Sequence, residues 1–207
     1  MFQLPDMSFR RLSLLAAVLL ITATVVVTSA RAQTALVTDF TLKRADNSAL
    51  TLSSLTGRKA VVVVFTNPGC PFSRLYQSRL NALSSAYAAQ GVEFLLVTAP
   101  INLEQTADAL DADKLKVKTS GDAGSPFTDE GLKTAALLGV SKTPEAVVLQ
   151  PVAGGFTVRY RGAIDDNPQM ESYVKDRYLK SAIDAVLAGQ TAAIAEKRAS
   201  GCLIKKN

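Results

Sequence analysis

An uninterrupted apolar run at residues 60–65 constrains the fold more than any other feature of the sequence. The run includes four consecutive valines and is broken by the turn-forming residues 67–69. A strand that is apolar on both faces is typical of the middle of a sheet that is covered on both sides. Pro71 then fits the first position of a helix, where its missing N–H costs nothing. A buried strand, a tight turn and a helix are therefore expected to follow one another around Cys70.

The rest of the chain continues to alternate between strand and helix patterns. The predicted elements are a short edge strand within 35–42, the strand 60–65, a helix from Pro71 that ends before Gly91, a strand at 92–97, a helix at 103–113, a loop at 114–126, a helix at 128–138 capped by Thr128 and ended by Gly139, a hairpin of strands 145–150 and 156–161 around a turn at 151–155, and a long helix at 170–187. Four tyrosines are expected in the core: Tyr76, Tyr87, Tyr173 and Tyr178. Parallel strands joined by crossover helices, followed by a hairpin, predict an α/β fold in which a mixed sheet has helices on both faces.

The N-terminal segment has the pattern of a secretory signal. Arg10 and Arg11 precede an apolar run at 12–27, and Ala30-Arg31-Ala32 supplies small residues at a cleavage site before Gln33. An uncleaved membrane anchor is the alternative, because the apolar run approaches the length of a membrane span. The sequence thus predicts a signal peptide or anchor at 1–32, a folded domain at 33–190 and a C-terminal tail at 191–207, in a periplasmic or extracellular protein.

Composition excludes several classes of site. The chain contains no histidine and only two cysteines, and its formal net charge is +5. A zinc site built from His and Cys, or a Ser-His-Asp catalytic unit, is therefore out of reach. No run of Lys and Arg interleaved with aromatic residues favours a nucleic-acid partner. We expect neither a metal nor an organic cofactor.

Cys70 is the residue whose position most favours chemistry. It stands between a buried strand and a helix, where unpaired backbone N–H groups and the helix dipole stabilise an anion. A thiolate at this place is expected to have a lowered pKa and to be a reactive nucleophile. A midpoint of alkylation rate against pH above that of a free thiol would contradict this expectation. The alternative is a buried cysteine that behaves as a small hydrophobic residue.

Residues 61–73, from the valine run through Cys70 to Ser73, resemble the active-site segment of the thioredoxin-like superfamily. Thr143-Pro144 matches the cis-proline of that superfamily, which lies against the reactive cysteine. The redoxin branch, related to alkyl hydroperoxide reductases and thiol-specific antioxidants, is indicated by three segments: residues 39–42, residues 160–166 and the C-terminal Gly201-Cys202-Leu203-Ile204-Lys205. The resemblance implies a thioredoxin-like fold and a thiol-dependent oxidoreductase. It also implies a substrate groove shaped by Pro71 and Pro144, with backbone hydrogen bonds offered by Thr143.

The sequence departs from close relatives of this superfamily at two positions near Cys70. Ser73 stands where thioredoxins have their second cysteine, so it is expected to donate a hydrogen bond to the thiolate or to cap the helix. Asn67 stands where peroxiredoxins have Thr or Ser, which argues against a complete peroxiredoxin site. Arg74 is expected on a solvated helix face, with electrostatic support of the Cys70 thiolate as the alternative. Asp165 and Asp166 are expected in a turn or a helix cap rather than in catalysis.

Cys202 is the natural partner of Cys70, and several roles remain open for it. It could resolve a mixed disulfide that Cys70 forms with a substrate, or condense with a sulfenic acid that a peroxide forms on Cys70. It could also form a permanent structural disulfide in a non-catalytic binding domain, or lie far from Cys70. The enzymatic alternatives imply thiol, disulfide or peroxide substrates and a thiol protein that supplies reducing equivalents, with a membrane involved only if the N-terminal segment is retained.

Overall fold

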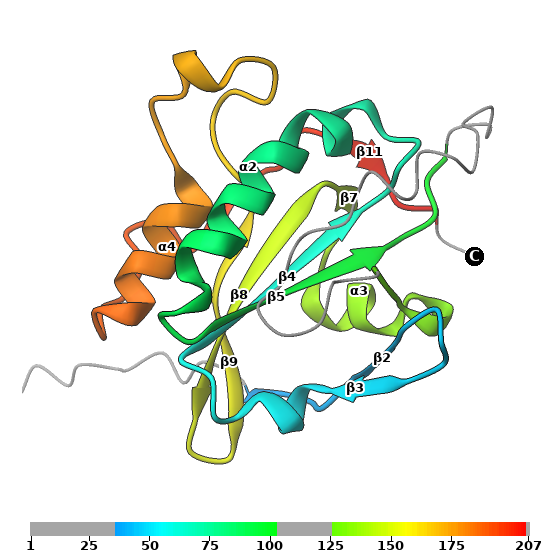
Figure 1. The fold of residues 1–207 in the computed structure, drawn as a ribbon, viewed down its shortest axis with the longest axis vertical. Coiled ribbons are helices and arrows are strands. Elements are labelled where there is room, and N and C mark those ends of the chain that lie inside the picture. Colours follow the sequence, from blue (N-terminus) through cyan, green and yellow to red (C-terminus); the bar gives the residue numbers. More distant parts are fainter. Residues whose placement is uncertain (1–35, 103–125, 206–207) are drawn as a thin grey trace, which may run out of the picture. The chain divides into compact units, whose positions relative to one another are not determined.

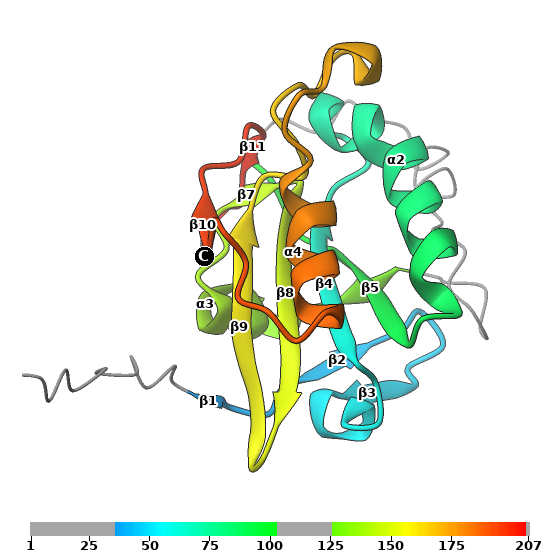
Figure 2. The ribbon, with the colours of Figure 1, turned by 90° about the vertical axis from the view of Figure 1, so that its left-hand side faces the viewer.

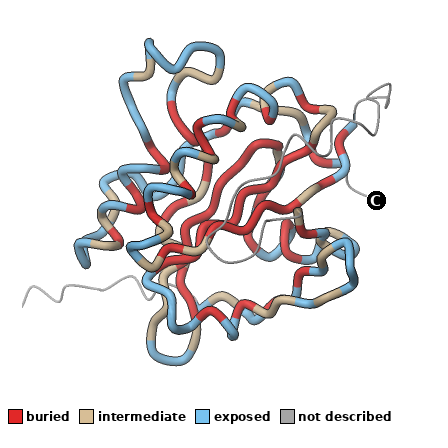
Figure 3. Tube along the Cα trace, viewed as in Figure 1, coloured by how far each residue is buried: buried red, intermediate tan, exposed pale blue. Residues whose placement is uncertain are grey.

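Strand β4 (Ala60–Thr66) forms the centre of the fold, and all seven of its residues are buried. The structure, a computed structural model, describes residues 36–102 and 126–205. β4 pairs in parallel with β5 (Val92–Thr98) and antiparallel with β8 (Glu145–Val152), as Figure 1 shows. The predicted central strand is thereby confirmed, and the burial along β4 and its neighbours is visible in Figure 3.

The sheet is mixed. Within the described residues, its strands follow the order β1-β9-β8-β4-β5-β6-β2-β3, and β10 pairs with β9 outside this path. The other strands of this sheet are β1 (Leu36–Val37), β2 (Thr41–Lys43), β3 (Ala49–Thr51), β6 (Phe127–Thr128), β9 (Gly155–Gly162) and β10 (Glu196–Lys197). A separate two-stranded sheet joins β7 (Lys142–Thr143) to β11 (Cys202–Leu203). The predicted hairpin is β8 and β9, with Gly154 in the turn between them.

Helices cover both faces of the sheet, as the alternation of strands and helices predicts. Helices α2 (Pro71–Ala88) and α4 (Tyr178–Leu187) pack on the face that carries Val62, Val64 and Val148. The short helix α3 (Lys133–Leu138) and the 3₁₀ turn Leu52–Leu55 pack on the opposite face, against Val63 and Phe65. Figures 1 and 2 show these two layers from perpendicular directions. The aliphatic strand residues thus bury both of their faces against apolar helix surfaces.

The predicted helix at 128–138 is wrong in its first half. Thr128 belongs to strand β6, a 3₁₀ turn occupies Glu130–Leu132, and regular helix begins only at Lys133. Gly131 and Leu132 adopt left-handed φ angles of 65° and 56°, which a continuous helix cannot contain. The side chain that receives the helix amides belongs to Asp129, which accepts hydrogen bonds from two backbone N–H groups of α3. Gly139 ends the helix as predicted.

The predicted long helix at 170–187 is also shorter than expected. A 3₁₀ turn spans Glu171–Tyr173, and α4 starts only at Tyr178. Tyr173 is 64% exposed, so its expected place in the core is wrong, whereas the other three tyrosines are buried. The carboxylate of Asp166 accepts the N–H groups of Lys175 and Asp176, and these bonds hold the segment in a loop instead of a helix.

Both ends of the domain differ from expectation. Two short strands, β1 and β2, replace the single edge strand at 35–42, and they lie at opposite sides of the sheet. The segment expected to be a tail contributes β10 and β11, so it is part of the fold.

Three predicted segments lie outside the described residues: the signal or anchor at 1–32, the helix at 103–113 and nearly all of the loop at 114–126. Along the described ranges, no helix has the length and apolar character needed to span a membrane.

Candidate active site around Cys70 and Cys202

Cys70 is the N-cap residue of helix α2, directly after the turn that follows β4. Asn67 builds this turn with three of its polar groups. Its side-chain carbonyl accepts the N–H of Gly69 at 2.8 Å, its side-chain amide donates to the carbonyl of Ala99 at 2.7 Å, and its backbone carbonyl accepts the N–H of Cys70 at 3.0 Å. Because Asn67 is only 6% exposed, these bonds fix the path of the chain into the helix.

Ser73 has a structural role that neither expectation for it included. Its hydroxyl is fully buried and accepts the backbone N–H of Asn67 at 3.2 Å. Ser73 therefore joins the first turn of α2 to the end of β4, and the structure shows neither a bond to the Cys70 sulfur nor a capping bond from its side chain. The second cysteine of thioredoxins is thus replaced here by a residue that holds the turn together.

The start of α2 is electropositive. No side chain caps it, no acidic residue lies in its first turn, and Pro71 occupies the first helical position as predicted. Its unpaired N–H groups point toward the N-cap, where they favour a negative charge. Arg74 lies on the exposed face of α2, as expected, and its guanidinium donates to the carbonyl of Pro68 at 3.1 Å. The side chain at position 70 therefore lies where the helix attracts anions.

The Thr143–Pro144 peptide bond is cis, as the resemblance to thioredoxin-like proteins implies. The carbonyl oxygen of Thr143 lies 3.0 Å from the Cys70 sulfur, so the proline segment lies against Cys70. The carboxylate of Glu145 stabilises this segment, because it accepts the backbone N–H groups of Ser141 and Lys142 at 2.9 and 3.1 Å. The position of Thr143 beside the cysteine thus depends on a buried carboxylate that the sequence analysis did not single out.

Cys70 and Cys202 form a disulfide, with their Cα atoms 6.0 Å apart and 132 positions apart in the sequence. Cys70 is fully buried, whereas Cys202 is partly exposed. Strand β11 brings Cys202 to the site by pairing antiparallel with β7, with Cys202 opposite Thr143. In Figures 1 and 2, β11 lies beside β7 near the end of the sheet where β4 leads into α2. The possibility that the two cysteines lie far apart is therefore excluded.

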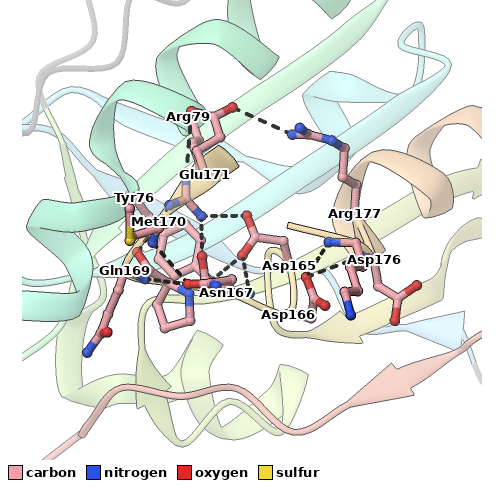
Figure 4. A network of polar contacts seen from close by, with 12 residues as sticks. Tyr76, Arg79, Asp165, Asp166, Asn167, Gln169, Met170, Glu171, Asp176 and Arg177 are labelled. Carbon is pink, nitrogen blue, oxygen red and sulfur yellow. Dashed lines mark hydrogen bonds and ion pairs between the residues drawn. The ribbon is translucent and has the colours of Figure 1, made fainter. Parts of the chain in front are cut away.

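A second polar cluster joins α2 to the loop that follows β9. Arg79 is 6% exposed, and its guanidinium forms an ion pair with Asp165 at 2.7 Å. The hydroxyl of Tyr76 donates to the same carboxylate at 2.7 Å, and the guanidinium also donates to the backbone carbonyls of Asn167 and Pro168. Figure 4 shows how the loop after β9 wraps around these side chains. Burial, together with the bond to Asp165, raises the pKa of Tyr76 far above its usual range.

This cluster extends the expectation for Asp165 and confirms the one for Asp166. Asp165 does more than shape a turn, because it neutralises a buried arginine that lies 86 positions earlier in the chain. Asp166 does organise a loop, as expected, by accepting two backbone N–H groups. Neither carboxylate contacts the disulfide through any hydrogen bond or ion pair that the structure contains in this region. Across the described residues, no group of three or more His, Cys, Asp or Glu side chains is arranged to hold a metal ion.

The fold brings the predicted catalytic and substrate-binding residues together from three separate segments of the chain. Cys70, Cys202 and Thr143 are in contact, and Pro144 follows Thr143 in the cis linkage. Pro71 directly follows Cys70 and is exposed. A sulfur at a helix N-terminus, covalently joined to a second sulfur on a separate strand, can take part in thiol–disulfide exchange when it is reduced.

Comparisons with known proteins agree with this arrangement. The redoxin family model matches residues 32–150. An uncharacterized conserved protein from Geobacillus kaustophilus has a similar structure, with 25% identity and a TM-score of 0.66 over 84% of this chain and 91% of that chain. A search of curated proteins found no match.

Two further solved structures share the fold at lower identity. A putative thiol:disulfide interchange protein DsbE from Chlorobium tepidum is 21% identical, with a TM-score of 0.51 over 73% of this chain and 95% of that chain. A thioredoxin-like protein from Aeropyrum pernix is 14% identical, with a TM-score of 0.52 over 84% of this chain and 97% of that chain. These two similarities confirm the thioredoxin-like fold.

Proposed function

Because the chain belongs to the redoxin family, we propose that it is an exported thiol-disulfide oxidoreductase with Cys70 as nucleophile and Cys202 as resolving cysteine. The observation that carries the proposal is the bond between Cys70, at the N-cap of α2, and Cys202, which arrives on a strand paired with the segment before Pro144. The signal-like pattern of residues 1–32 supports export. The putative interchange protein among the structural neighbours is a precedent for this chemistry on the same fold.

The first step needs Cys70 as a thiolate. Burial and the nearby Thr143 carbonyl favour the protonated thiol, whereas the unpaired N–H groups at the start of α2 favour the thiolate. Reduction releases Cys202 from the sulfur, so water can replace it and the cost of desolvation falls. The N–H groups at the start of α2 then outweigh the remaining burial, so the thiolate is favoured. The Cys70 thiolate attacks one sulfur of a substrate disulfide, a new S–S bond forms, and the other substrate sulfur leaves as a thiolate.

The second step uses Cys202. Its thiolate attacks the Cys70 sulfur of the mixed disulfide, the bond to the substrate breaks, and the second substrate sulfur leaves with the electron pair. The product is the Cys70–Cys202 disulfide, which is the state of this structure. The protein has then given two electrons to its substrate. A thiol protein as reductant returns them by the same kind of exchange and regenerates both thiols.

Peroxide reduction is the competing reaction for the same two cysteines. The Cys70 thiolate would attack one peroxide oxygen, and the O–O bond would break with release of water or an alcohol. The sulfenic acid formed on Cys70 would then condense with the Cys202 thiol, which gives the disulfide and a further water. Asn67 stands where peroxiredoxins have a hydroxyl residue, and both polar groups of its side chain already bond to the backbone. Disulfide exchange therefore has the stronger support.

An assay of disulfide reduction with the full chain tests this proposal. Cys70→Ser should abolish turnover, whereas Cys202→Ser should leave the first attack intact and trap a mixed disulfide that mass spectrometry detects. Rapid peroxide consumption that is lost in Cys70→Ser would favour the peroxidase. Unchanged activity in Cys70→Ser, together with a lowered melting temperature, would instead support a binding domain with a structural disulfide.

A further inference from the structure

The C-terminal segment around Cys202 lies in a slot between two stretches of backbone. On one side it pairs with β7, and the N–H of Ile204 continues this pairing by donating to the carbonyl of Ser141. On the other side, the N–H of Asn102 donates to the carbonyl of Leu203, and the N–H of Lys205 donates to the carbonyl of Pro100. The segment is thus held largely by main-chain hydrogen bonds, which any extended polypeptide can make.

Gly201 lies where this slot leaves no space for a side chain. A Cβ atom on Gly201 would lie 2.2 Å from the carbonyl oxygen and 2.8 Å from the carbonyl carbon of Thr143. These are backbone atoms beside the cis proline, so they cannot turn away as a flexible side chain could. Gly201 is not one of the glycines with a left-handed φ angle, so the requirement concerns space and not conformation. The slot therefore excludes a side chain on the residue before the cysteine.

The two residues after the cysteine face different surroundings. Leu203 is 56% exposed, so its side chain contributes little to the fit. Ile204 is 6% exposed and packs in the apolar cluster that includes Leu138 and Val140. Ile204 also lines a partly open pocket of about 440 Å³ beside helix α3, together with Leu132 and Ala135, so this position favours an apolar side chain. The slot thus favours a pattern of glycine, cysteine, any residue and an apolar residue.

From this slot we infer the substrate preference of the oxidoreductase, an inference that rests on the proposed function. Once Cys70–Cys202 is reduced and the C-terminal segment leaves, the slot accepts an extended polypeptide whose disulfide-bonded cysteine follows a glycine and precedes an apolar residue by two positions. The Cys70 thiolate attacks the sulfur of that cysteine. The new bond joins Cys70 to the polypeptide, and the former partner sulfur leaves as a thiolate.

The test uses a full chain whose slot is vacated. The variant Gly201→Ala/Cys202→Ser removes the internal thiol and weakens the seating of the C-terminal segment. The probe is the peptide Ala-Ser-Gly-Cys-Leu-Ile-Lys, with its cysteine joined in a disulfide to the chromophore thionitrobenzoate. Release of the chromophore reports attack by Cys70. Three matched peptides replace the glycine by alanine, the isoleucine by asparagine, or the exposed leucine by lysine.

The parent peptide and the lysine peptide are expected to react at similar rates. The alanine and asparagine peptides should each react at least about tenfold more slowly, because overpacking and burial of an unpaired amide weaken docking. Rates within about twofold for all four peptides would overturn the inference. If the double variant fails to fold, Cys202→Ser alone supports the same comparison, with the docked segment as a competitor.

A small symmetrical disulfide separates this inference from the proposed function. The disulfide of thionitrobenzoate reaches Cys70 without filling the slot. Reaction with this reagent, combined with equal rates for the four peptides, would overturn the substrate preference and leave the oxidoreductase standing. Failure of Cys70 to react with the reagent would overturn both.

Discussion

A buried ion pair between Arg79 and Asp165 joins α2 to the loop after β9. Removing Asp165 leaves the buried Arg79 guanidinium with only the half-exposed Glu171 carboxylate, 3.7 Å away, as a charged partner. Asp165→Ala is therefore expected to lower the free energy of unfolding by about 3–5 kcal/mol, as measured by chemical denaturation.

The matched control for this prediction is an exposed ion pair. Lys43 and Glu130 lie 2.9 Å apart with both side chains half-exposed or more. Glu130→Ala should change the unfolding free energy far less than Asp165→Ala, because water solvates the remaining lysine. Equal losses in the two variants would contradict the importance given to burial.

Glu93 is expected to make the free energy of unfolding depend on pH. Burial raises the pKa of this carboxyl on β5, and the guanidinium of Arg58 at 3.0 Å only partly offsets the rise. Between the usual pKa of a glutamate and the raised one, the folded protein binds more protons than the unfolded chain. The free energy of unfolding must therefore fall as the pH rises through that interval.

The variant Glu93→Gln isolates this effect, because glutamine does not ionise. Denaturation of both proteins across the acidic range should show the wild type losing stability relative to Glu93→Gln as the pH rises. A constant difference, or one that grows in favour of the wild type, would show that the carboxyl is not penalised by burial.

Single residues were predictable from the sequence where their role depends on close neighbours in the chain. Cys70 and Pro71 stand between a strand and a helix, and that local pattern defines their place. Arg79 was not predictable, since nothing near it in the sequence indicates a partner in the loop after β9. The contact of Ser73 with the turn was missed for a related reason. Its partner is the backbone N–H of Asn67, and the sequence does not show how the turn closes.

At the scale of elements, hydrophobic periodicity located β4, α2, β5 and the β8–β9 hairpin. It failed at 128–138, where residues with left-handed φ angles interrupt the helix. It also failed at 170–177, where the Asp166 side chain bonds to the backbone and holds a loop. It also missed β11, because two strand residues are too few to show alternation. The pairing of β11 with β7 depends on tertiary contacts instead.

The C-terminal strand should depend on the disulfide for its order. Reduction is expected to speed hydrogen exchange at the amides of Asn102, Ile204 and Lys205, since these donors join the segment to its two neighbours. Amides of β4 should keep their protection, because this strand is paired and buried on both sides. Hydrogen exchange followed by NMR or mass spectrometry checks both expectations, and Cys202→Ser should behave like the reduced protein. Unchanged protection at the three amides would show that the segment stays docked without the bond.

At the scale of the whole molecule, the disulfide joins the first helix after the central strand to the C-terminal end of the chain. The sequence indicated the two cysteines and the compartment in which they could pair, but it left their separation open. The fold decides this point, because β10 and β11 return the chain along β9 and β7 to the start of α2. The disulfide thus ties the C-terminal segment to the start of α2 and keeps the sulfur of Cys70, the candidate nucleophile, in a covalent bond.

The reduction potential of the Cys70–Cys202 bond tests the central claim most directly. It is measured by equilibrating the full chain with glutathione buffers and counting alkylated thiols by mass spectrometry. The start of α2 stabilises the Cys70 thiolate and hence the reduced protein, so the potential should lie between about −270 and −120 mV, the range of thiol-disulfide oxidoreductases. A potential below about −300 mV would identify a structural disulfide and contradict the proposed redox cycle.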